Sequence, residues 1–469
     1  MKQKITAVFD IGKTNKKLLL FDGNYRVIEE HVEKWDEIID EDGFACDDLL
    51  KLTNWIKSSW AALKNNQKFE IEAVNVAAYG ASFVHLDANN STVTPLYSYL
   101  KPFPKDLEAK LYETYGSAEK FTLETCSPTL GMLNSGLQLL WLKHVHPQAF
   151  RKIHTSLHLP QYIAFLLSEN LFSDYTSVGC HTALWNFEAK KYHQWVYDEH
   201  IDHKLAPFTD STSIVKDGIK YGFGLHDSSS VVMAYLRQCK GQFMILSTGT
   251  WCIVLNPFSD KPLASNELKQ DVLSFLTAEG NPIKAARMFL GREHDHQVEQ
   301  LAAHFNVDTN YFKKIQYNPI ILEQIIDQPK AIQFECMNGT GPFPTAKNTQ
   351  QPTDYHPTAE LAYHQLLLDL VSILSVSFGL VSTDDAKTIY IDGGFARNQL
   401  FVQLLANLLP QKNIVVSEVP QATALGAAMW VNQNETLASD WTFRPVDADA
   451  LSNKVCTYSA QYIADYGKF

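Results

Sequence analysis

Cysteine is scarce in this sequence, and the few cysteines that occur follow no recognisable pattern. The seven are Cys46, Cys126, Cys180, Cys239, Cys252, Cys336 and Cys456. Their number is odd, they are widely scattered, and no two of them form a CxxC pair. This spacing predicts neither a disulfide framework nor a zinc site, and it favours a reducing compartment such as the cytoplasm.

Positive charge and long apolar runs are also in short supply. The chain has 40 basic and 52 acidic residues, a net charge of -12, so no general field attracts nucleic acid or anionic membrane, and any phosphate site must be local. No apolar run reaches membrane-spanning length by inspection. The first residues, MKQKITAVFDIG, run directly into a predicted strand without the pattern of a signal peptide. We therefore expect a cytoplasmic protein that binds neither nucleic acid nor membrane; whether it is a monomer or a homodimer stays open.

What is present is typical of a globular enzyme with a substantial core. The composition is 45% hydrophobic and 20% charged, and the sequence contains no low-complexity segment, charge block or coiled-coil heptad. At 469 residues the chain is too long for a single core, so length predicts at least two domains.

A strand–turn–strand pattern occurs twice. Residues 5–12 and 16–22 are apolar runs separated by a short polar turn, and residues 242–256 repeat this arrangement. The repeat sets Asp10-Ile11-Gly12-Lys13 against Ser247-Thr248-Gly249-Thr250, as a duplicated domain would. We therefore predict two related domains, residues 1–238 and 239–469.

Each of the two turns has the chemistry of a phosphate site. Phosphate needs closely approaching backbone N–H groups, hydroxyls and positive charge, and magnesium needs a carboxylate. The candidates are Asp10, Gly12, Lys13, Thr14, Asn15 and Lys17 in the first turn, and Thr248, Gly249 and Thr250 in the second. Either turn alone is also ordinary hairpin chemistry, but two at corresponding places favour a triphosphate held between them.

Two further loops carry candidate residues. Asp392-Gly393-Gly394 and Asn398 lie between a predicted strand and helix, where glycine backbone can lie against a base or ribose, although a tight turn without a ligand has the same pattern. Asp227, in GLHDSSS, can accept the proton of an attacking hydroxyl. The same His-Asp pair also occurs in metal-dependent phosphohydrolases, but further ligands with suitable spacing are missing. Asp227 could also be the N-cap of the helix that follows, which is compatible with catalysis.

The order of these motifs resembles the FGGY carbohydrate kinases of the actin-like ATPase superfamily. The resemblance covers nearly the whole chain, from DIGKTN through GLHDSSS, STGTW and DGGFARN to ATALGAA at 422–428. YGASFVHLD, HDSSSVV and LSTGTW are most similar to the rhamnulokinase and fuculokinase branch, which phosphorylates deoxy-ketoses. The resemblance implies an α/β fold of two actin-like (ribonuclease H-like) domains with a cleft between them, the first mainly for sugar and the second mainly for ATP.

The resemblance also implies roles for single residues. It makes Asp227 the catalytic base and Asp10 the magnesium-associated carboxylate, with ATP and Mg²⁺ as cofactors. It places five residues beside the sugar: Gly80, Ala81, Ser82, His226 and Ser228. It assigns the two turns to the phosphates, and Gly393, Gly394 and Asn398 to the adenosine pocket.

Four positions depart from the family pattern: Lys13, Gln138, Met288 and Gln421. Lys13 replaces a hydroxyl, Gln138 a lysine, Met288 an asparagine that contacts sugar, and Gln421 a glutamate. We expect Lys13 either to add a cation beside the phosphates or to point into solvent. The departures leave phosphoryl transfer intact and leave the identity of the sugar open. Two alternative functions also stay open: a non-catalytic sensor that binds sugar and nucleotide, and an actin- or chaperone-type ATPase.

Histidine-rich segments carry a weaker signal. In Glu293-His294-Asp295-His296 the two histidines would point to different faces of a helix, so we expect a solvated surface rather than a metal site. His154 and His158 have suitable spacing but no visible third ligand. Trp185, near Asp174, could line the sugar site, although tryptophans of this kind usually belong to the core.

Overall fold

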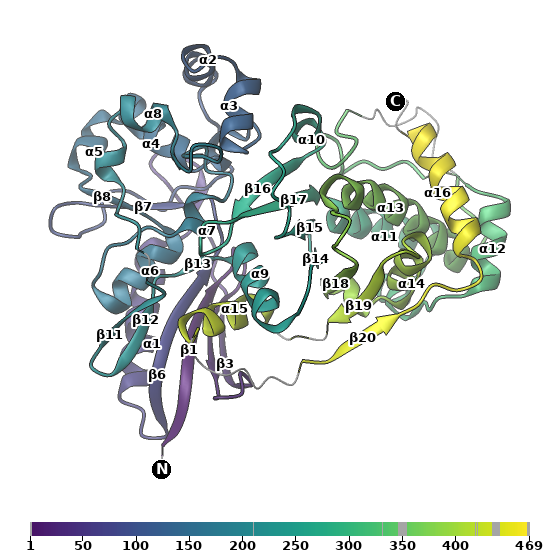
Figure 1. Cartoon of the computed structure of the whole chain (residues 1–469), viewed down its shortest axis with the longest axis horizontal. Helices are drawn as coiled ribbons and strands as arrows, with labels where there is room; N and C mark the ends of the chain where they lie inside the picture. Colours follow the sequence, from purple (N-terminus) through teal and green to yellow (C-terminus); the bar gives the residue numbers. More distant parts are fainter. Residues whose placement is uncertain are drawn as a thin grey trace. The chain divides into compact units, whose positions relative to one another are not determined.

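The computed structural model describes residues 2–209, 211–330, 332–345, 354–417, 419, 421–433 and 441–466. The chain divides into two compact α/β units (Figure 1). Unit 1 comprises Met1–Lys240, Ser274–Pro282 and Pro420–Asp440, and unit 2 comprises Gly241–Leu273, Ile283–Val419 and Trp441–Phe469. Compared with a single division near residue 238, two segments of the second half of the chain therefore belong to unit 1.

Unit 1 is built on a seven-stranded mixed sheet. Its strands are β1 (Gln3–Ile11), β2 (Lys16–Phe21), β3 (Val27–Glu33), β6 (Phe69–Ala78), β11 (Ser213–Lys216), β12 (Ile219–Gly222) and β13 (Leu225–His226). The order is β11-β12-β6-β1-β2-β3, with β13 also paired to β6. β1, β2 and β3 are antiparallel neighbours, whereas β6 runs parallel to β1, and β12 and β13 run parallel to β6.

Unit 2 is built on a second seven-stranded sheet with the same core topology. Its strands are β14 (Phe243–Thr248), β15 (Cys252–Asn256), β16 (Val272–Leu276), β17 (Pro282–Met288), β18 (Thr388–Gly393), β19 (Asn413–Ser417) and β20 (Phe443–Val446). The order is β16-β17-β15-β14-β18-β19-β20. β14, β15 and β17 are antiparallel neighbours, and β18 and β19 continue from β14 in parallel. The repeated turn seen in the sequence therefore occupies the same place in both sheets.

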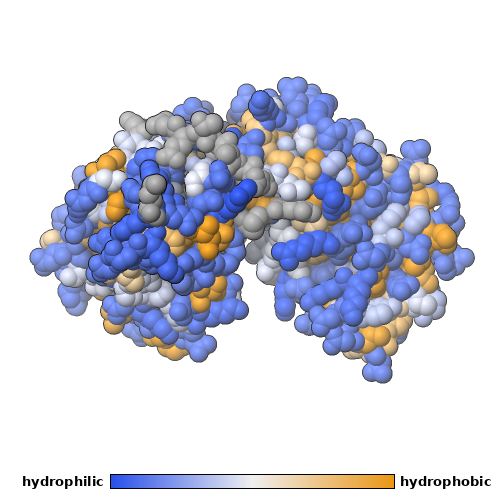
Figure 2. Space-filling view, turned by 90° about the horizontal axis from the view of Figure 1, so that it is seen from below, coloured by the Kyte–Doolittle hydropathy of each residue, from blue (hydrophilic) through white to orange (hydrophobic). Residues whose placement is uncertain are grey.

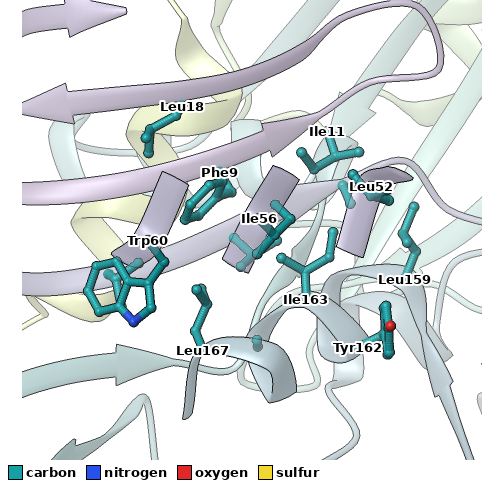
Figure 3. Packing of buried hydrophobic residues seen from close by; sticks show 14 of the residues in the cluster. Phe9, Ile11, Leu18, Leu52, Ile56, Trp60, Leu159, Tyr162, Ile163 and Leu167 are labelled. Carbon is teal, nitrogen blue, oxygen red and sulfur yellow. The ribbon is translucent and has the colours of Figure 1, made fainter. Parts of the chain in front are cut away.

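Helices cover both faces of the sheet of unit 1. Because side chains alternate along a strand, Phe9 and Ile11 of β1 face one side and Thr6 faces the other. On the first side, α1 (Leu49–Lys64) and α6 (Leu159–Ser168) pack their apolar residues onto the strands (Figure 3). Asp48 caps α1 by accepting the backbone N–H of Lys51. The buried residues of α1 recur every three or four positions, which is the helical period.

On the other side, α9 (Asp227–Gln238) and α15 (Ala422–Val431) pack together against β1 and β6. The two helices approach closely at Gly426, where a Cβ atom would lie 1.8 Å from the carbonyl oxygen of Ser230. Asn75 of β6 donates to the Ala427 carbonyl at 2.8 Å, and Asn432 donates to the Thr6 hydroxyl at 2.7 Å. These polar contacts tie α15 to the sheet.

A second core in unit 1 lies around Phe83, Phe121, Leu137 and Trp195. Its helices are α2 (Lys105–Thr114), α3 (Ala118–Thr125), α4 (Gly136–Val145), α5 (Pro147–Lys152), α7 (Tyr175–Val178) and α8 (Gln194–Asp198). The smaller strands form three pairs: β4 (Ile38–Ile39) with β5 (Ala45–Cys46), β7 (Phe83–Leu86) with β8 (Thr155–His158), and β9 (Trp185–Asn186) with β10 (Lys191–Tyr192). β7 thus pairs with β8, which lies about 70 residues further along the chain. Trp185 lies in this second core, as tryptophans of this kind usually do.

The helices of unit 2 gather around α13 (Ala359–Val381). The others are α10 (Ser265–Lys269), α11 (Leu290–Phe305), α12 (Pro319–Asp327), α14 (Gln399–Leu408) and α16 (Ser452–Tyr466). By length and composition α13 could cross a membrane, which the inspection of the sequence did not single out, but 78% of its apolar window is buried inside the protein. α13 therefore has the setting of a core helix. Figure 2 shows mainly hydrophilic residues on the face that it presents, with apolar residues in small groups.

Candidate active site

Asp227 stands at the junction of β13 and α9. His226 ends β13, opposite Ala78 of β6, and Asp227 is the first residue of the helix. The N-cap is therefore His226, one position earlier than the sequence suggested. The Asp227 carboxylate accepts the backbone N–H of Ser228 at 2.6 Å and its hydroxyl at 3.2 Å. Its side chain remains 36% exposed, so a ligand can reach it.

His226 keeps Asp227 in its charged form. The His226 Nε2 atom lies 3.1 Å from Asp227 Oδ1. Partial burial opposes the charge on Asp227, but the imidazole and the two bonds from Ser228 outweigh it and lower the pKa of the carboxyl. Burial also opposes the charge on His226, yet Cys180 and Asp227 together raise the pKa of the imidazole to about 10. At neutral pH Asp227 is a carboxylate with an acceptor oxygen available.

The predicted sugar-contact turn lies beside His226. A Cβ atom on Gly80 would lie 3.0 Å from His226 Cδ2 and 3.1 Å from Cys180 Sγ, so glycine lets the turn approach both. Ala81 has a left-handed φ of 60°. Gln138 supports this conformation, because its amide donates to the Ala81 carbonyl at 2.8 Å. Ser82 is buried and its carbonyl accepts the N–H of Leu159.

Asp10 lies at the end of β1, one strand away from Asp227. Its backbone pairs with Lys17 of β2 and with Ala77 of β6. Burial raises the pKa of Asp10 to about 7, Lys17 opposes this, and the charge of Asp227 adds to it. In the turn that follows, Gly12 donates to the Asn15 carbonyl at 2.8 Å, and Thr14 is exposed. The structure thus brings Asp10, the first turn and Asp227 to one edge of the sheet of unit 1.

The Lys13 side chain does not point freely into solvent. Its amine lies 2.7 Å from Asp47 and 2.7 Å from Glu37, with the side chain 28% exposed. It is therefore bound to carboxylates on the flank of the turn rather than directed into solvent. Lys17 donates to Gln421 at 2.7 Å, so the amide that replaces the family's glutamate still contacts this turn.

In unit 2, the second turn and the double-glycine loop meet at the β14–β18 pair. The Thr248 hydroxyl donates to the Asp392 carbonyl at 2.5 Å and accepts the N–H of Phe395 at 3.0 Å. Gly393 has a φ of 91°, and a Cβ atom there would lie 2.0 Å from the Thr248 carbonyl oxygen. Burial raises the pKa of Asp392 to about 6, opposed by the Gly393 N–H.

The backbone of this edge is open. Gly249, Thr250, Gly393 and Gly394 are exposed, and no atom lies within 4 Å of a Cβ built on Gly394. Glycine backbone that is open in this way can lie flat against a ligand.

The side chain of Asn398 is already engaged within unit 2. Its amide donates to the Tyr363 hydroxyl at 2.9 Å, and its oxygen caps α14 at Phe401. Met288 is buried at the end of β17, opposite Cys252, so its side chain packs in the core of unit 2.

The Glu293–His296 segment is less solvated than the sequence suggested, since Glu293 is fully buried and only Asp295 is exposed. His294 contacts the Tyr363 hydroxyl, and His296 pairs with Glu335. Within the residues that the structure describes, no group of three or more His, Cys, Asp or Glu side chains could hold a metal ion. The seven cysteines, all of which lie in the described part of the chain, form no disulfide bond.

Sequence reasoning missed the residues that surround His226. Cys180 Sγ lies 3.1 Å from His226 Nε2, and Thr176 Oγ1 accepts the backbone N–H of His226 at 2.9 Å. Asp174 in turn accepts the N–H and the hydroxyl of Thr176. No motif marks this segment, since its contacts are set by the packing of α7 against β13.

Comparison with known proteins agrees with the repeated fold. Residues 5–217 match the N-terminal domain model of the FGGY family of carbohydrate kinases, and residues 240–439 match the C-terminal domain model of carbohydrate kinase FGGY. The chain is 24% identical to a rhamnulokinase of Halalkalibacterium halodurans over 91% of this chain and 93% of that protein. It is 22% identical to a rhamnulokinase of Oceanobacillus iheyensis over 90% and 92%.

Solved structures share the fold at low identity. A carbohydrate kinase from Novosphingobium aromaticivorans matches with a TM-score of 0.84 and 22% identity, over 100% of this chain and 99% of that one. A xylulose kinase from Lactobacillus acidophilus matches with a TM-score of 0.78 and 15% identity, over 99% and 100%. With the two domain models covering most of its length, the chain belongs to the FGGY family of carbohydrate kinases and is a sugar kinase with the actin-like fold.

Proposed function

We propose that this enzyme transfers the γ-phosphoryl group of ATP to a hydroxyl of a ketose, with Asp227 as the base. The observation that carries the proposal is the setting of Asp227, which is ionised, partly exposed, held by His226 and Ser228, and at the same sheet edge as the first turn. In phosphoryl transfer to an alcohol, such a carboxylate orients the hydroxyl and accepts its proton.

The proposed substrate class is a deoxy-ketose such as L-rhamnulose or L-fuculose. Support comes from the two rhamnulokinases that match over nearly the whole chain, although at 24% and 22% identity, and from the YGASFVHLD and HDSSSVV segments. The fold neighbours include xylulose, gluconate and glycerol kinases, which are alternatives for the assay. We place Gly80, Ala81, Ser82, His226 and Ser228 beside the sugar.

Unit 1 has a carboxylate suited to a magnesium ion. Among the described residues, Asp10 accepts no side-chain hydrogen bond, and its carboxyl is buried enough that burial raises its pKa to about 7. A cation would stabilise the charged form there, and hard oxygen ligands suit Mg²⁺. We propose that Asp10 holds Mg²⁺ and that Gly12, Lys13, Thr14, Asn15 and Lys17 make up the first phosphate turn. Since Lys13 is paired with Asp47 and Glu37, only its backbone is a candidate donor.

Unit 2 offers the matching groups for the rest of the nucleotide. We propose that Thr248, Gly249 and Thr250 contact phosphate oxygens and that Gly393 and Gly394 lie against adenosine. Asn398 supports this surface through Tyr363 and the start of α14. When bound, MgATP supplies the phosphoryl group and the cation that offsets its charge. We also propose that sugar binds mainly to residues 1–238 and ATP mainly to residues 239–469.

The test is ADP release from MgATP across ketoses, polyols and deoxy-sugars, with a control that lacks sugar. Sugar-dependent release, greatest for deoxy-ketoses, is the expected result. ADP release without sugar would favour an ATPase. The absence of ADP release with every sugar tested, while ATP still binds, would favour a sensor.

The role of Asp227 has its own test. Asp227→Asn keeps the shape of the side chain, so nucleotide binding should persist while sugar-dependent kcat falls by about 10²- to 10⁴-fold, the usual contribution of a general base. Asp198→Asn, at an exposed carboxylate elsewhere in unit 1, is the matched control. Undiminished turnover in Asp227→Asn would remove Asp227 from the mechanism.

A further inference from the structure

The contact between Cys180 and His226 is not explained by the proposed chemistry. Both side chains are buried, with relative exposures of 0% and 4%. His226 Nε2 lies 3.1 Å from Cys180 Sγ and 3.1 Å from Asp227 Oδ1. One ring nitrogen therefore faces a thiol and a carboxylate at equal distance, so its protonation decides both contacts.

Two protonation patterns compete at this nitrogen. If the thiol keeps its proton and donates it to Nε2, the lone pair of Nε2 is occupied, and the Asp227 oxygen at 3.1 Å receives no hydrogen bond. If Nε2 carries the proton, it donates to Asp227, and the sulfur accepts. Only the second pattern gives the base a donor that fixes its orientation.

The surroundings of the pair favour the second pattern. Burial opposes the thiolate, but the neighbouring His181 and His226 outweigh this and lower the pKa of the Cys180 thiol to about 6. The centroid of the apolar Phe275 ring lies 5.5 Å from that of the His226 ring and 6.0 Å from that of the His181 ring. This ring limits the access of water to Cys180 and His226. Gly80 closes the remaining side, because it lies against both Sγ and the imidazole.

Other charged groups around His226 do not replace Cys180. From α7, Asp174 acts only through Thr176 and the backbone of His226. From β8, burial and the neighbouring imidazoles lower the pKa of His158 to about 3, so it is neutral. Among the described residues, the partner of the other ring nitrogen, Nδ1, is the Ser229 hydroxyl at 3.5 Å. Asp10, on β1, acts on Asp227 rather than on His226.

We propose that Cys180 is a positioning residue, which as a thiolate holds His226 as an imidazolium so that Nε2 donates to the base Asp227. The proton leaves Sγ, the S–H bond breaks and an N–H bond forms at Nε2, with no change of oxidation state. This inference rests on the proposed role of Asp227, and Cys180 itself touches no substrate.

The first test follows the pH dependence of kcat/KM in the wild type, Cys180→Ala and Cys180→Ser. Since Cys180 raises the pKa of His226, His226 stays protonated until high pH in the wild type, and activity declines on the alkaline side as it loses its proton. Removing the negative charge should move this alkaline limb to lower pH by about one to three units, the usual effect of a close opposite charge. Serine keeps a hydrogen bond but no charge, so it should shift the limb as alanine does.

Several outcomes would overturn the inference. An alkaline limb that stays in place in both variants, whatever the loss in kcat, would assign Cys180 a packing role only. If the alkaline limb lies at lower pH in Cys180→Ala but at the wild-type pH in Cys180→Ser, a neutral hydrogen bond at this position is sufficient and no thiolate is needed. Cys46→Ala, at another buried cysteine of unit 1, is the matched control and should leave the profile unchanged.

The second test does not depend on activity. Thiolates absorb in the ultraviolet where thiols do not, so the difference between the wild type and Cys180→Ala across a pH titration isolates the ionisation of Cys180. Thiolate absorbance already present below neutral pH is expected, whereas ionisation at about pH 8.5, the value of a free thiol, would overturn the pair. If Asp227→Asn keeps full activity or no sugar is phosphorylated, the proposed function fails, yet this measurement still decides the state of Cys180.

Discussion

Replacing Asp47 with alanine tests how the first phosphate turn is held in place. The Asp47 carboxylate accepts from Lys13 at 2.7 Å, from Lys16 at 3.0 Å and from the Tyr79 hydroxyl at 2.7 Å. Lys16 also donates to the Lys13 carbonyl at 2.8 Å. The side chains of Asp47 and Lys16 are only 9% and 3% exposed. Their contact therefore fixes the backbone of the turn from within the protein.

The expected loss of stability follows from burial. Removing one partner of a buried ion pair costs about 3–5 kcal/mol, because the other charge stays buried without compensation. At roughly 2–4 °C per kcal/mol for a unit of this size, the thermal transition of unit 1 should fall by about 6–20 °C. Burial opposes the charge on Asp47, but Lys13 and Tyr79 lower the pKa of its carboxyl below the ordinary value. The stabilisation is therefore present above about pH 4 and is lost as pH falls further.

Thermal unfolding of the full chain followed by circular dichroism measures this. Asp47→Leu combined with Lys16→Met should recover much of the loss, because no buried charge is left unpaired. The control is Glu72→Ala, which breaks a largely exposed contact with Lys4 and should cost at most about 1 kcal/mol. If Asp47→Ala melts like Glu72→Ala, the carboxylate does not hold the turn, and the reasoning from burial is wrong.

Two further outcomes can be measured in unit 2. In denaturant unfolding, Gly393→Ala should destabilise unit 2 by more than about 2 kcal/mol, because Gly393 has a positive φ and a Cβ atom there would lie 2.0 Å from the Thr248 carbonyl oxygen. Gly394→Ala, where a Cβ atom has free space, should change the stability by no more than about 0.5 kcal/mol. Equal effects of the two substitutions would contradict this reasoning. Burial raises the pKa of Asp369 to about 8, although hydrogen bonds from Tyr458 and Gln365 oppose this shift. Folding therefore favours the protonated carboxyl, and the free energy of unfolding should fall by up to about 1.4 kcal/mol per pH unit as the pH rises from roughly 4 to 8. Asp369→Asn should flatten this slope in melts at the two ends of that range, and an unchanged slope would refute the assignment.

The repeated turn is the part of the fold that local sequence predicted best. Apolar alternation and the Gly-rich turns predicted β1–β2 and β14–β15, because strand period and turn geometry depend on neighbouring residues. The partner of β7, by contrast, could not be predicted from local sequence. Pairing with β8 joins segments far apart in the sequence, and nothing in either segment encodes that choice.

The candidate site shows the same limit. Asp10 and Asp227 could be found from their motifs, since each lies in a turn with a recognisable pattern. The tight contact of Gly80 with His226 and Cys180 could not, because it depends on how β6, β13 and the segment after α7 pack. The contacts of the Lys13 side chain could not be predicted for a similar reason: its partner Asp47 lies 34 residues away in sequence.

The sequence alone determined the order of the motifs, the duplicated strand–turn–strand and the family that these imply, all of which rest on short-range patterns. The tertiary structure decided that the 421–433 segment belongs to unit 1, where Gly426 allows α15 to approach α9. It also decided that Cys180 and Asp227 share one imidazole. These features arise from contacts between segments far apart in the chain, and such contacts depend on the packing of the sheets and helices rather than on any local pattern.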